Sequence, residues 1–321
     1  MPPARSVARP LIVLLVCCLI GGCSLSAVGS RQLDLLVSDY GMRRLLVEGE
    51  GYWHLVLLRG DPLSAPVVHI YLEGDGLPWS GPRRISLDPG PRDPLALRLM
   101  VQDPTPSIYL GRPCYHGLAE SAGCSPWMWT FGRYSPQVVG SMTAALRRLW
   151  PPKDRPRLTL IGYSGGGVIG FLMAERLTEV ERLVTLAANL DVDAWSEAHG
   201  YSRLEGSLNP ALRAPLPGSI AQIHLLGDRD AIVPPVTISR FRSANPRAEY
   251  LRVRGYDHRC CWSEGWKGIL AGMRRRSPSV GSVELPAHAG IDPVVHPVPF
   301  VEHGVVVHEG GDAAREDGRE P

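Results

Sequence analysis

The sequence predicts an α/β protein with a doubly wound, mostly parallel sheet and an antiparallel hairpin at its amino-terminal side. Three observations support this fold class. Short apolar runs typical of buried strands alternate with segments typical of helices. The first two strand-like runs are joined by a tight glycine turn. Residues 67–72 are fully apolar, which is typical of a strand that is buried on both faces of a parallel sheet.

The overall composition is that of a globular protein. The chain has 321 residues, a length that suffices for one large domain or two modest ones. Of these residues, 44% are hydrophobic and 21% are charged. It carries 34 basic and 32 acidic side chains, so neither sign is in strong excess. This balance gives no reason to expect nucleic acid or another polyanion as a partner.

Residues 1–22 have the three-part pattern of a secretory signal. The apolar run LIVLLVCCLI is too short to cross a bilayer, which needs roughly 20 residues. The ending LIGGC resembles a bacterial lipobox, in which signal peptidase cuts before a cysteine that then carries lipid. This resemblance implies lipid attachment at Cys23, and Ser24 after it implies an outer-membrane location facing the periplasm. A plain signal that is cut elsewhere is the alternative.

Cysteine usage agrees with export. Beyond the signal and Cys23, the sequence has Cys114, Cys124, Cys260 and Cys261. An even number in an oxidising compartment indicates disulfides, although four cysteines allow three pairings. We favour Cys114–Cys124, which closes a short local loop. Cys260 and Cys261 would then form a vicinal bridge or stay as thiols.

The predicted domain spans residues 41–276 and lies between two segments without a predicted core. Residues 23–40 are expected to be a tether that follows the anchor. Residues 277–321 are rich in proline and glycine, show no helical or strand period, and are expected to be a disordered tail. The spacings of the tail histidines fit no common ligand pattern, so we expect no metal site. These histidines are His288, His296, His303 and His308.

The first half of the domain supplies the hairpin, two strands and a helix. Residues 42–61 give two strand-like runs around the GEG turn. Residues 67–72 and 104–113 are the next two strands. Ser135 and a following proline predict a helix that begins with a side-chain cap and continues to Trp150.

The second half alternates strands with helices, which implies parallel pairing. The predicted strands are 157–162, 182–190, 221–228 and 248–255, and the predicted helices are 166–177 and 262–276.

The segment GYSGG, residues 162–166, fits the pattern G-x-S-x-G, with a predicted strand before it and a predicted helix after it. In this context the serine occupies a sharp, strained turn with its Oγ above the sheet. The Gly165 N–H points into the same space, where the helix amino terminus favours negative charge. Ser164 is therefore a candidate nucleophile.

A serine nucleophile needs a base to accept its proton and a carboxylate to orient that base. Both residue types follow later strands. Asp228 and Asp230 come after the strand at 221–228, and His258 comes after the next strand. The other histidines of the domain lie inside strands or precede these acids, so His258 is the candidate base.

Together, GYSGG, GDRDAIVP and GYDH resemble the α/β-hydrolase superfamily over about residues 40–276. The resemblance implies a serine hydrolase that cleaves a carboxylic ester or related acyl bond through an acyl-enzyme, without metal or organic cofactor. It assigns Ser164 as nucleophile, His258 as base and, through the pattern G-x-x-D-x-x-V-P, Asp230 as the acid. Asp228 and Asp257 are the less favoured acids.

The resemblance also implies an oxyanion hole formed by the Gly165 N–H and a second N–H from the loop after residues 67–72. Glu73 stands where many members have histidine. We expect the second donor to be the Asp75 N–H, with Gly74 beside it. Trp79, just beyond this loop, either lines the pocket or packs the loop.

The substrate is expected to be a small-molecule acyl compound of unassigned class. The connection between residues 190 and 221 is too short for a large helical cap, and the aromatic excursion at 112–134 either borders the site or packs as a surface loop. Two other functions stay open. One is an acyltransferase or depolymerase with the same triad, and the other is a non-catalytic binding lipoprotein of the cell envelope.

Overall fold

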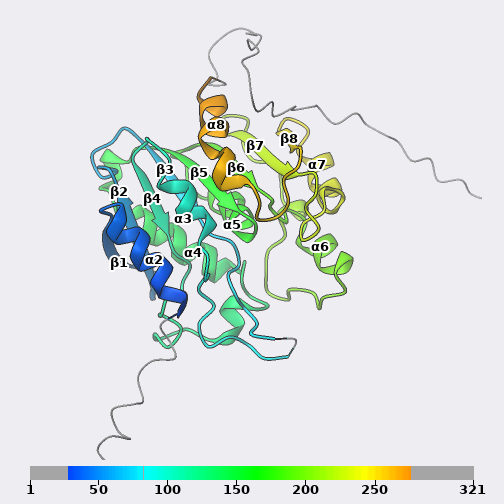
Figure 1. The fold of residues 1–321 in the computed structure, drawn as a ribbon, viewed down its shortest axis with the longest axis horizontal. Helices are drawn as coiled ribbons and strands as arrows, with labels where there is room; N and C mark the ends of the chain where they lie inside the picture. Colours follow the sequence, from blue (N-terminus) through cyan, green and yellow to red (C-terminus); the bar gives the residue numbers. More distant parts are fainter. Residues whose placement is uncertain (1–27, 82, 276–321) are drawn as a thin grey trace, which may run out of the picture.

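Eight strands form one sheet in the computed structural model, which describes residues 28–81 and 83–275 (Figure 1). Their order across the sheet is β1-β2-β4-β3-β5-β6-β7-β8. β2 pairs antiparallel with β1 and β4, and all other neighbours are parallel. The predicted fold class is confirmed. The strands are β1 (Arg43–Gly49), β2 (Tyr52–Arg59), β3 (Val67–Leu72), β4 (Ser107–Leu110), β5 (Arg157–Tyr163), β6 (Val180–Leu186), β7 (Ala221–Gly227) and β8 (Glu249–Val253).

Helices cover the sheet on both faces (Figure 1). α4 and α5 pack on one face, and α2, α3 and α8 pack on the other. The helices are α2 (Val28–Asp39), α3 (Leu95–Met100), α4 (Pro136–Arg147), α5 (Gly165–Ala174), α6 (Val192–Ala198), α7 (Ser239–Ala244) and α8 (Trp262–Arg275). Short 3-10 turns are η1 (Pro126–Trp129), η2 (Pro152–Asp154), η3 (Pro210–Leu212) and η4 (Pro235–Ile238).

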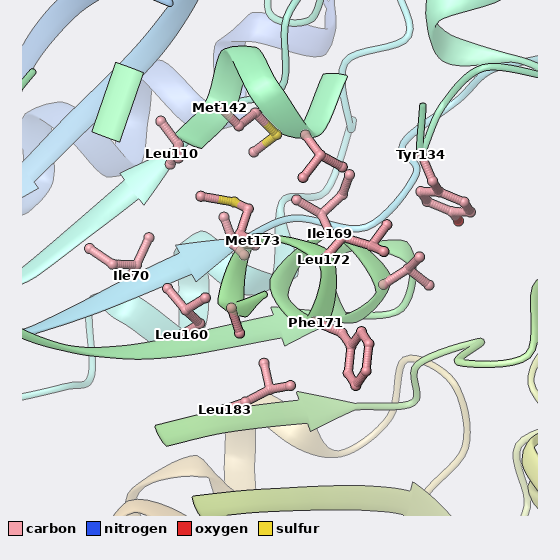
Figure 2. Close-up of a cluster of buried hydrophobic side chains, with 14 of the residues drawn as sticks. Ile70, Leu110, Tyr134, Met142, Leu160, Ile169, Phe171, Leu172, Met173 and Leu183 are labelled. Carbon is pink, nitrogen blue, oxygen red and sulfur yellow. The ribbon is translucent and has the colours of Figure 1, made fainter. Parts of the chain in front are cut away.

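The larger core lies between the sheet and the α4–α5 layer. Figure 2 shows side chains from four neighbouring strands facing those of α4 and α5. All ten residues of α5 are buried, so this helix is apolar around its whole circumference and fixes the strand-to-helix turn that precedes it. The labelled strand residues are Leu110, Ile70, Leu160 and Leu183, and the labelled helix residues include Met142, Ile169, Leu172 and Met173.

The helix predicted from Ser135 is present as α4. Ser135 Oγ accepts a hydrogen bond from the Val138 N–H at 3.3 Å, and Pro136 occupies the first helical position. The helix ends at Arg147 and not at Trp150. Trp150 instead packs in the core and donates from Nε1 to the Pro62 carbonyl at 3.2 Å.

The tether predicted for residues 23–40 is wrong for most of its length, because residues 28–39 form helix α2. Leu33 is 4% exposed and belongs to the core beneath α3 and α8, and Leu36 and Val37 pack against the same core. These three residues share one helical face at spacings of three and four. The folded domain therefore begins before residue 41.

The remaining terminal predictions lie outside the described residues. They are the signal at 1–22, lipidation at Cys23 and the tail at 277–321. Among the helices of the described part, none has the length and apolar character needed to cross a membrane.

Both cysteine pairs of the domain are bonded. Cys114 and Cys124 form a disulfide with their Cα atoms 5.6 Å apart. Cys260 and Cys261 form the vicinal bridge that was one of the two alternatives for this pair.

Leu33→Ala tests whether α2 belongs to the domain. Removing a buried leucine side chain leaves a cavity, so we expect the free energy of unfolding in urea to fall by about 2–5 kcal/mol. Leu35→Ala is the matched control on the same helix. Leu35 is 54% exposed, and its loss should change stability by no more than about 0.5 kcal/mol. Equal effects of the two substitutions would mean that α2 does not pack on the sheet.

Candidate active site

The candidate site lies at the edge of the sheet where the parallel strands β3, β5, β7 and β8 end. Ser164 follows β5 directly, Asp230 follows β7, and His258 follows β8. Residues 73–76 follow β3. Because the carboxyl ends of parallel strands share one edge, the fold brings these four segments together, and open α/β sheets bind ligands at such edges.

Ser164 occupies a sharp turn with strained backbone geometry, at φ +50° and ψ −125°. The turn is held by hydrogen bonds from the Ser164 N–H to the Leu186 carbonyl and from the Gly167 N–H to the Ser164 carbonyl, both at 2.8 Å. A Cβ on Gly162 would lie 2.3 Å from the Gly166 carbonyl oxygen. Only glycine therefore fits at position 162, and the serine side chain stays partly exposed.

Asp230 and His258 are directly hydrogen-bonded, with 2.9 Å between Asp230 Oδ2 and His258 Nδ1. The side chain of Asp230 is 1% exposed and that of His258 is 13% exposed. Asp230 Oδ1 also accepts hydrogen bonds from the N–H groups of Ile232 and Val233, at 2.9 and 2.7 Å. The carboxylate is thus fixed by the loop after β7, and a bond at Nδ1 leaves Nε2 of the imidazole for another partner.

The two less favoured acids make local contacts only. Asp228 is exposed and accepts a hydrogen bond from the Gly255 N–H at 2.7 Å. Asp257 is exposed and accepts from the N–H groups of Arg259 and Cys260, both at 2.7 Å. Neither carboxylate is hydrogen-bonded to His258 within the described part of the chain.

The other histidines of the domain have separate partners. His69 pairs with Asp103 at 2.6 Å. His224 is fully buried, and this burial lowers the pKa of its imidazole to about 3. His199 contacts the Ile232 carbonyl oxygen through Nε2 at 2.7 Å.

Glu73, the departure from the family pattern, has a backbone-supporting role. Its carboxylate accepts hydrogen bonds from the Gly74 N–H at 3.1 Å and from the Ala96 N–H at 3.0 Å, which ties the loop after β3 to the start of α3. The Gly74 N–H is therefore occupied. In contrast, neither the Asp75 N–H nor the Gly165 N–H donates a hydrogen bond to a residue in 28–81 or 83–275.

The Asp75 side chain belongs to a buried ionic cluster that sequence analysis missed. Its carboxylate lies 2.9 Å from a nitrogen of Arg112 and 2.9 Å from a nitrogen of Arg133. The Tyr134 hydroxyl reaches both carboxylate oxygens, at 2.8 and 2.7 Å. Burial alone would raise the pKa of Asp75, but the charges of Arg133 and Arg112 and the Tyr134 hydroxyl hold it below the usual value. Asp75 therefore stays ionised.

Trp79 and the excursion at 112–134 contact each other. The rings of Trp79 and Phe131 are 6.3 Å apart in an edge-to-face arrangement.

Two surface hollows of about 700 and 340 Å³ lie elsewhere, one between α6 and η4 and the other at the amino ends of β3 and β5. Neither hollow is lined by Ser164, Asp230 or His258.

Metal ions in proteins are held by groups of histidine, cysteine or acidic side chains. Within 28–81 and 83–275, no three histidine, cysteine or acidic side chains gather in a way that could hold a metal ion. The tail histidines lie outside this part of the chain.

The chain resembles solved esterase structures in fold. An esterase from Pyrococcus furiosus superposes with a TM-score of 0.52 at 15% identity, covering 75% of this chain and 93% of that one. Naproxen esterase from Bacillus subtilis gives a TM-score of 0.49 at 14% identity, covering 78% and 99%. No protein-family model and no curated protein matches the sequence. At such low identity the likeness concerns the fold alone, and the chain has the α/β-hydrolase fold.

Glu73→Gln tests the titration of the buried carboxyl beside the site. Burial raises the pKa of Glu73 to about 7 from an ordinary value of 4.5, and hydrogen bonds from backbone N–H groups only partly oppose this. Between these two values the folded chain holds a proton that the unfolded chain has lost. The free energy of unfolding should therefore fall as the pH rises from 4.5 to 7, by roughly 3 kcal/mol at about 1.4 kcal/mol per pH unit.

Urea unfolding across this pH range should show a smaller fall in the free energy of unfolding for Glu73→Gln than for the wild type, because glutamine does not titrate. Glu205→Gln, at an exposed position, should keep the wild-type profile. Parallel profiles for the wild type and Glu73→Gln would contradict the raised pKa.

Proposed function

We propose that this chain is a serine hydrolase that cleaves a carboxylic ester or a related acyl bond. The observation that carries this proposal is the buried Asp230–His258 hydrogen bond, at the same sheet edge as Ser164 on its strained turn. The α/β-hydrolase fold supports it, because in this fold the three positions hold the nucleophile, acid and base.

In the proposed reaction, Ser164 Oγ attacks the acyl carbon while His258 accepts the hydroxyl proton at Nε2. Asp230 holds the imidazole in the tautomer that has its proton on Nδ1 and stabilises the imidazolium that forms. His258 then gives the proton to the departing alcohol, which leaves an acyl-enzyme on Ser164. Water, deprotonated by the same histidine, releases the acid.

The negative oxygen of the tetrahedral intermediate requires donors that are not otherwise used. We assign this role to the N–H groups of Gly165 and Asp75, both of which lack a partner among the described residues. The Gly74 N–H is less suited, since it donates to Glu73. Gly165 is also the first residue of α5, so the helix dipole favours negative charge at this point.

We further propose that the protein is attached to the bacterial envelope through lipid on Cys23. The support is the lipobox-like LIGGC ending of the signal, and α2 begins shortly after it. The expected position is the periplasmic side of the outer membrane.

A small-molecule acyl substrate suits the connection between β6 and β7, which contains only α6 and η3 and no large cap.

Labelling with a fluorophosphonate tests the nucleophile. The full-length protein in detergent should be labelled, and Ser164→Ala should abolish both labelling and ester hydrolysis, with a fall in kcat of at least about 10³-fold. Circular dichroism of the variant should match the wild type. A well-folded wild type that resists the probe would contradict the proposal and favour a binding function on this scaffold.

Asp230→Asn and Asp228→Asn separate the two acids at the end of β7. Loss of the orienting carboxylate should reduce kcat by roughly 10³–10⁴-fold in Asp230→Asn. Asp228 supports only the Gly255 backbone, so Asp228→Asn should keep its kcat. The opposite ranking would reassign the acid.

Cys23→Ser tests the anchor. Fractionation of bacterial cells should move the protein from the membrane pellet to the soluble fraction, because lipid attachment requires the thiol. Cys114→Ser, which breaks the Cys114–Cys124 disulfide but leaves Cys23 in place, should leave the protein in the pellet. Retention of Cys23→Ser in the pellet after a high-salt wash would rule out this attachment.

A further inference from the structure

The Asp75 carboxylate lies beside Gly165, whose N–H is one of the two proposed oxyanion donors. A Cβ on Gly165 would be 1.9 Å from Asp75 Oδ1 and 2.6 Å from the Tyr134 hydroxyl oxygen. On the same loop, a Cβ on Gly74 would lie 3.4 Å from Ser164 Cβ. The carboxylate is thus packed against the first residue of α5, beside the serine.

An isolated carboxylate at this position would oppose catalysis. Its charge would repel the tetrahedral oxyanion, and the low polarity of a buried site would strengthen that repulsion. The cluster removes this difficulty. Arg112 and Arg133 carry two positive charges against the one negative charge of Asp75, and their side chains are 3% and 7% exposed. The net charge of the cluster is therefore +1, the sign that favours an oxyanion.

The same contacts fix the peptide that carries the second donor. The Tyr115 hydroxyl donates to the Asp75 carbonyl oxygen at 3.0 Å, so both the side chain and the backbone of Asp75 are held. Arg112 and Tyr115 come from the start of the excursion at 112–134, and Arg133 and Tyr134 come from its end. The Cys114–Cys124 disulfide lies within this excursion.

We propose that Arg112, Arg133 and Tyr134 are positioning residues of the oxyanion site. They hold Asp75 so that its N–H faces the reacting oxygen, and they reverse the sign of the local charge. This inference rests on the proposed function and adds that the excursion at 112–134 supports the transition state instead of binding the acyl group.

Tyr134→Phe and Tyr71→Phe form a matched pair for the test. Each removes one buried hydroxyl that is bonded to an aspartate, since the Tyr134 hydroxyl donates to Asp75 and the Tyr71 hydroxyl donates to Asp103 at 2.7 Å. Both tyrosines are fully buried, but the Tyr71 cluster lies on the other face of the sheet. In the full-length protein, Tyr134→Phe should lower kcat about 10–100-fold with KM changed less than about threefold, because ground-state binding does not use the oxyanion donors. Tyr71→Phe should change neither constant.

A trifluoromethyl ketone provides a second readout, because addition of the serine oxygen to its carbonyl carbon forms a tetrahedral oxyanion. Tyr134→Phe should weaken its inhibition by the same factor as kcat, whereas the uncharged alcohol product should inhibit as before. A second pair reports on charge: Arg133→Lys should keep more of kcat than Arg133→Met, because lysine retains the positive charge.

The outcomes separate the two proposals. If Tyr134→Phe and Tyr71→Phe lower kcat equally, while Ser164→Ala still abolishes turnover, the positioning role alone is overturned. A higher KM with an unchanged kcat in Tyr134→Phe would also overturn the positioning role alone. Turnover that survives in Ser164→Ala would overturn the proposed function and this inference together.

Discussion

The sharp turn from β5 into α5 is the constraint on which the rest of the site depends. Ser164 is held in a region of backbone space that costs of order 1–3 kcal/mol for a residue with a side chain. The complete burial of α5 and the short hydrogen bond from the Ser164 N–H to β6 offset that cost. The other groups in the site are placed relative to this turn through the sheet, because β3 pairs directly with β5, and β7 and β8 are joined to it through β6.

The sequence predicts the parts of the site that depend on short segments. GYSGG predicts its turn because it lies between a predicted strand and a predicted helix. The loops after β7 and β8 each carry their acid or histidine within a few residues of the strand end. The starting point of the domain is less predictable. Residues 28–39 have a weak apolar pattern, and contact of Leu33, Leu36 and Val37 with the core beneath α3 stabilises them as a helix.

The cluster around Asp75 could not be found in this way. Asp75 and the residues that surround it come from three separate segments, and neither arginine differs in local sequence from one on the surface. Their significance arises only when the excursion at 112–134 folds back over the loop after β3. Glu73 shows the same limit. Set against the family pattern it is an anomaly, but in the structure its carboxylate satisfies backbone N–H groups that would otherwise be unpaired.

The open border of the sheet at β1 has a consequence for self-association. Its outer side is left without a strand partner in the described part of the chain, and Leu45 and Leu46 on this strand are 36% and 56% exposed. Such an exposed edge strand can pair with the same strand of another copy, which leads to aggregation. Arg43 and Arg44 begin the strand, and Asp34 of α2 pairs with Arg44. Arg43 and the Arg44–Asp34 ion pair thus place charged groups on this edge strand, which disfavours its pairing with another copy.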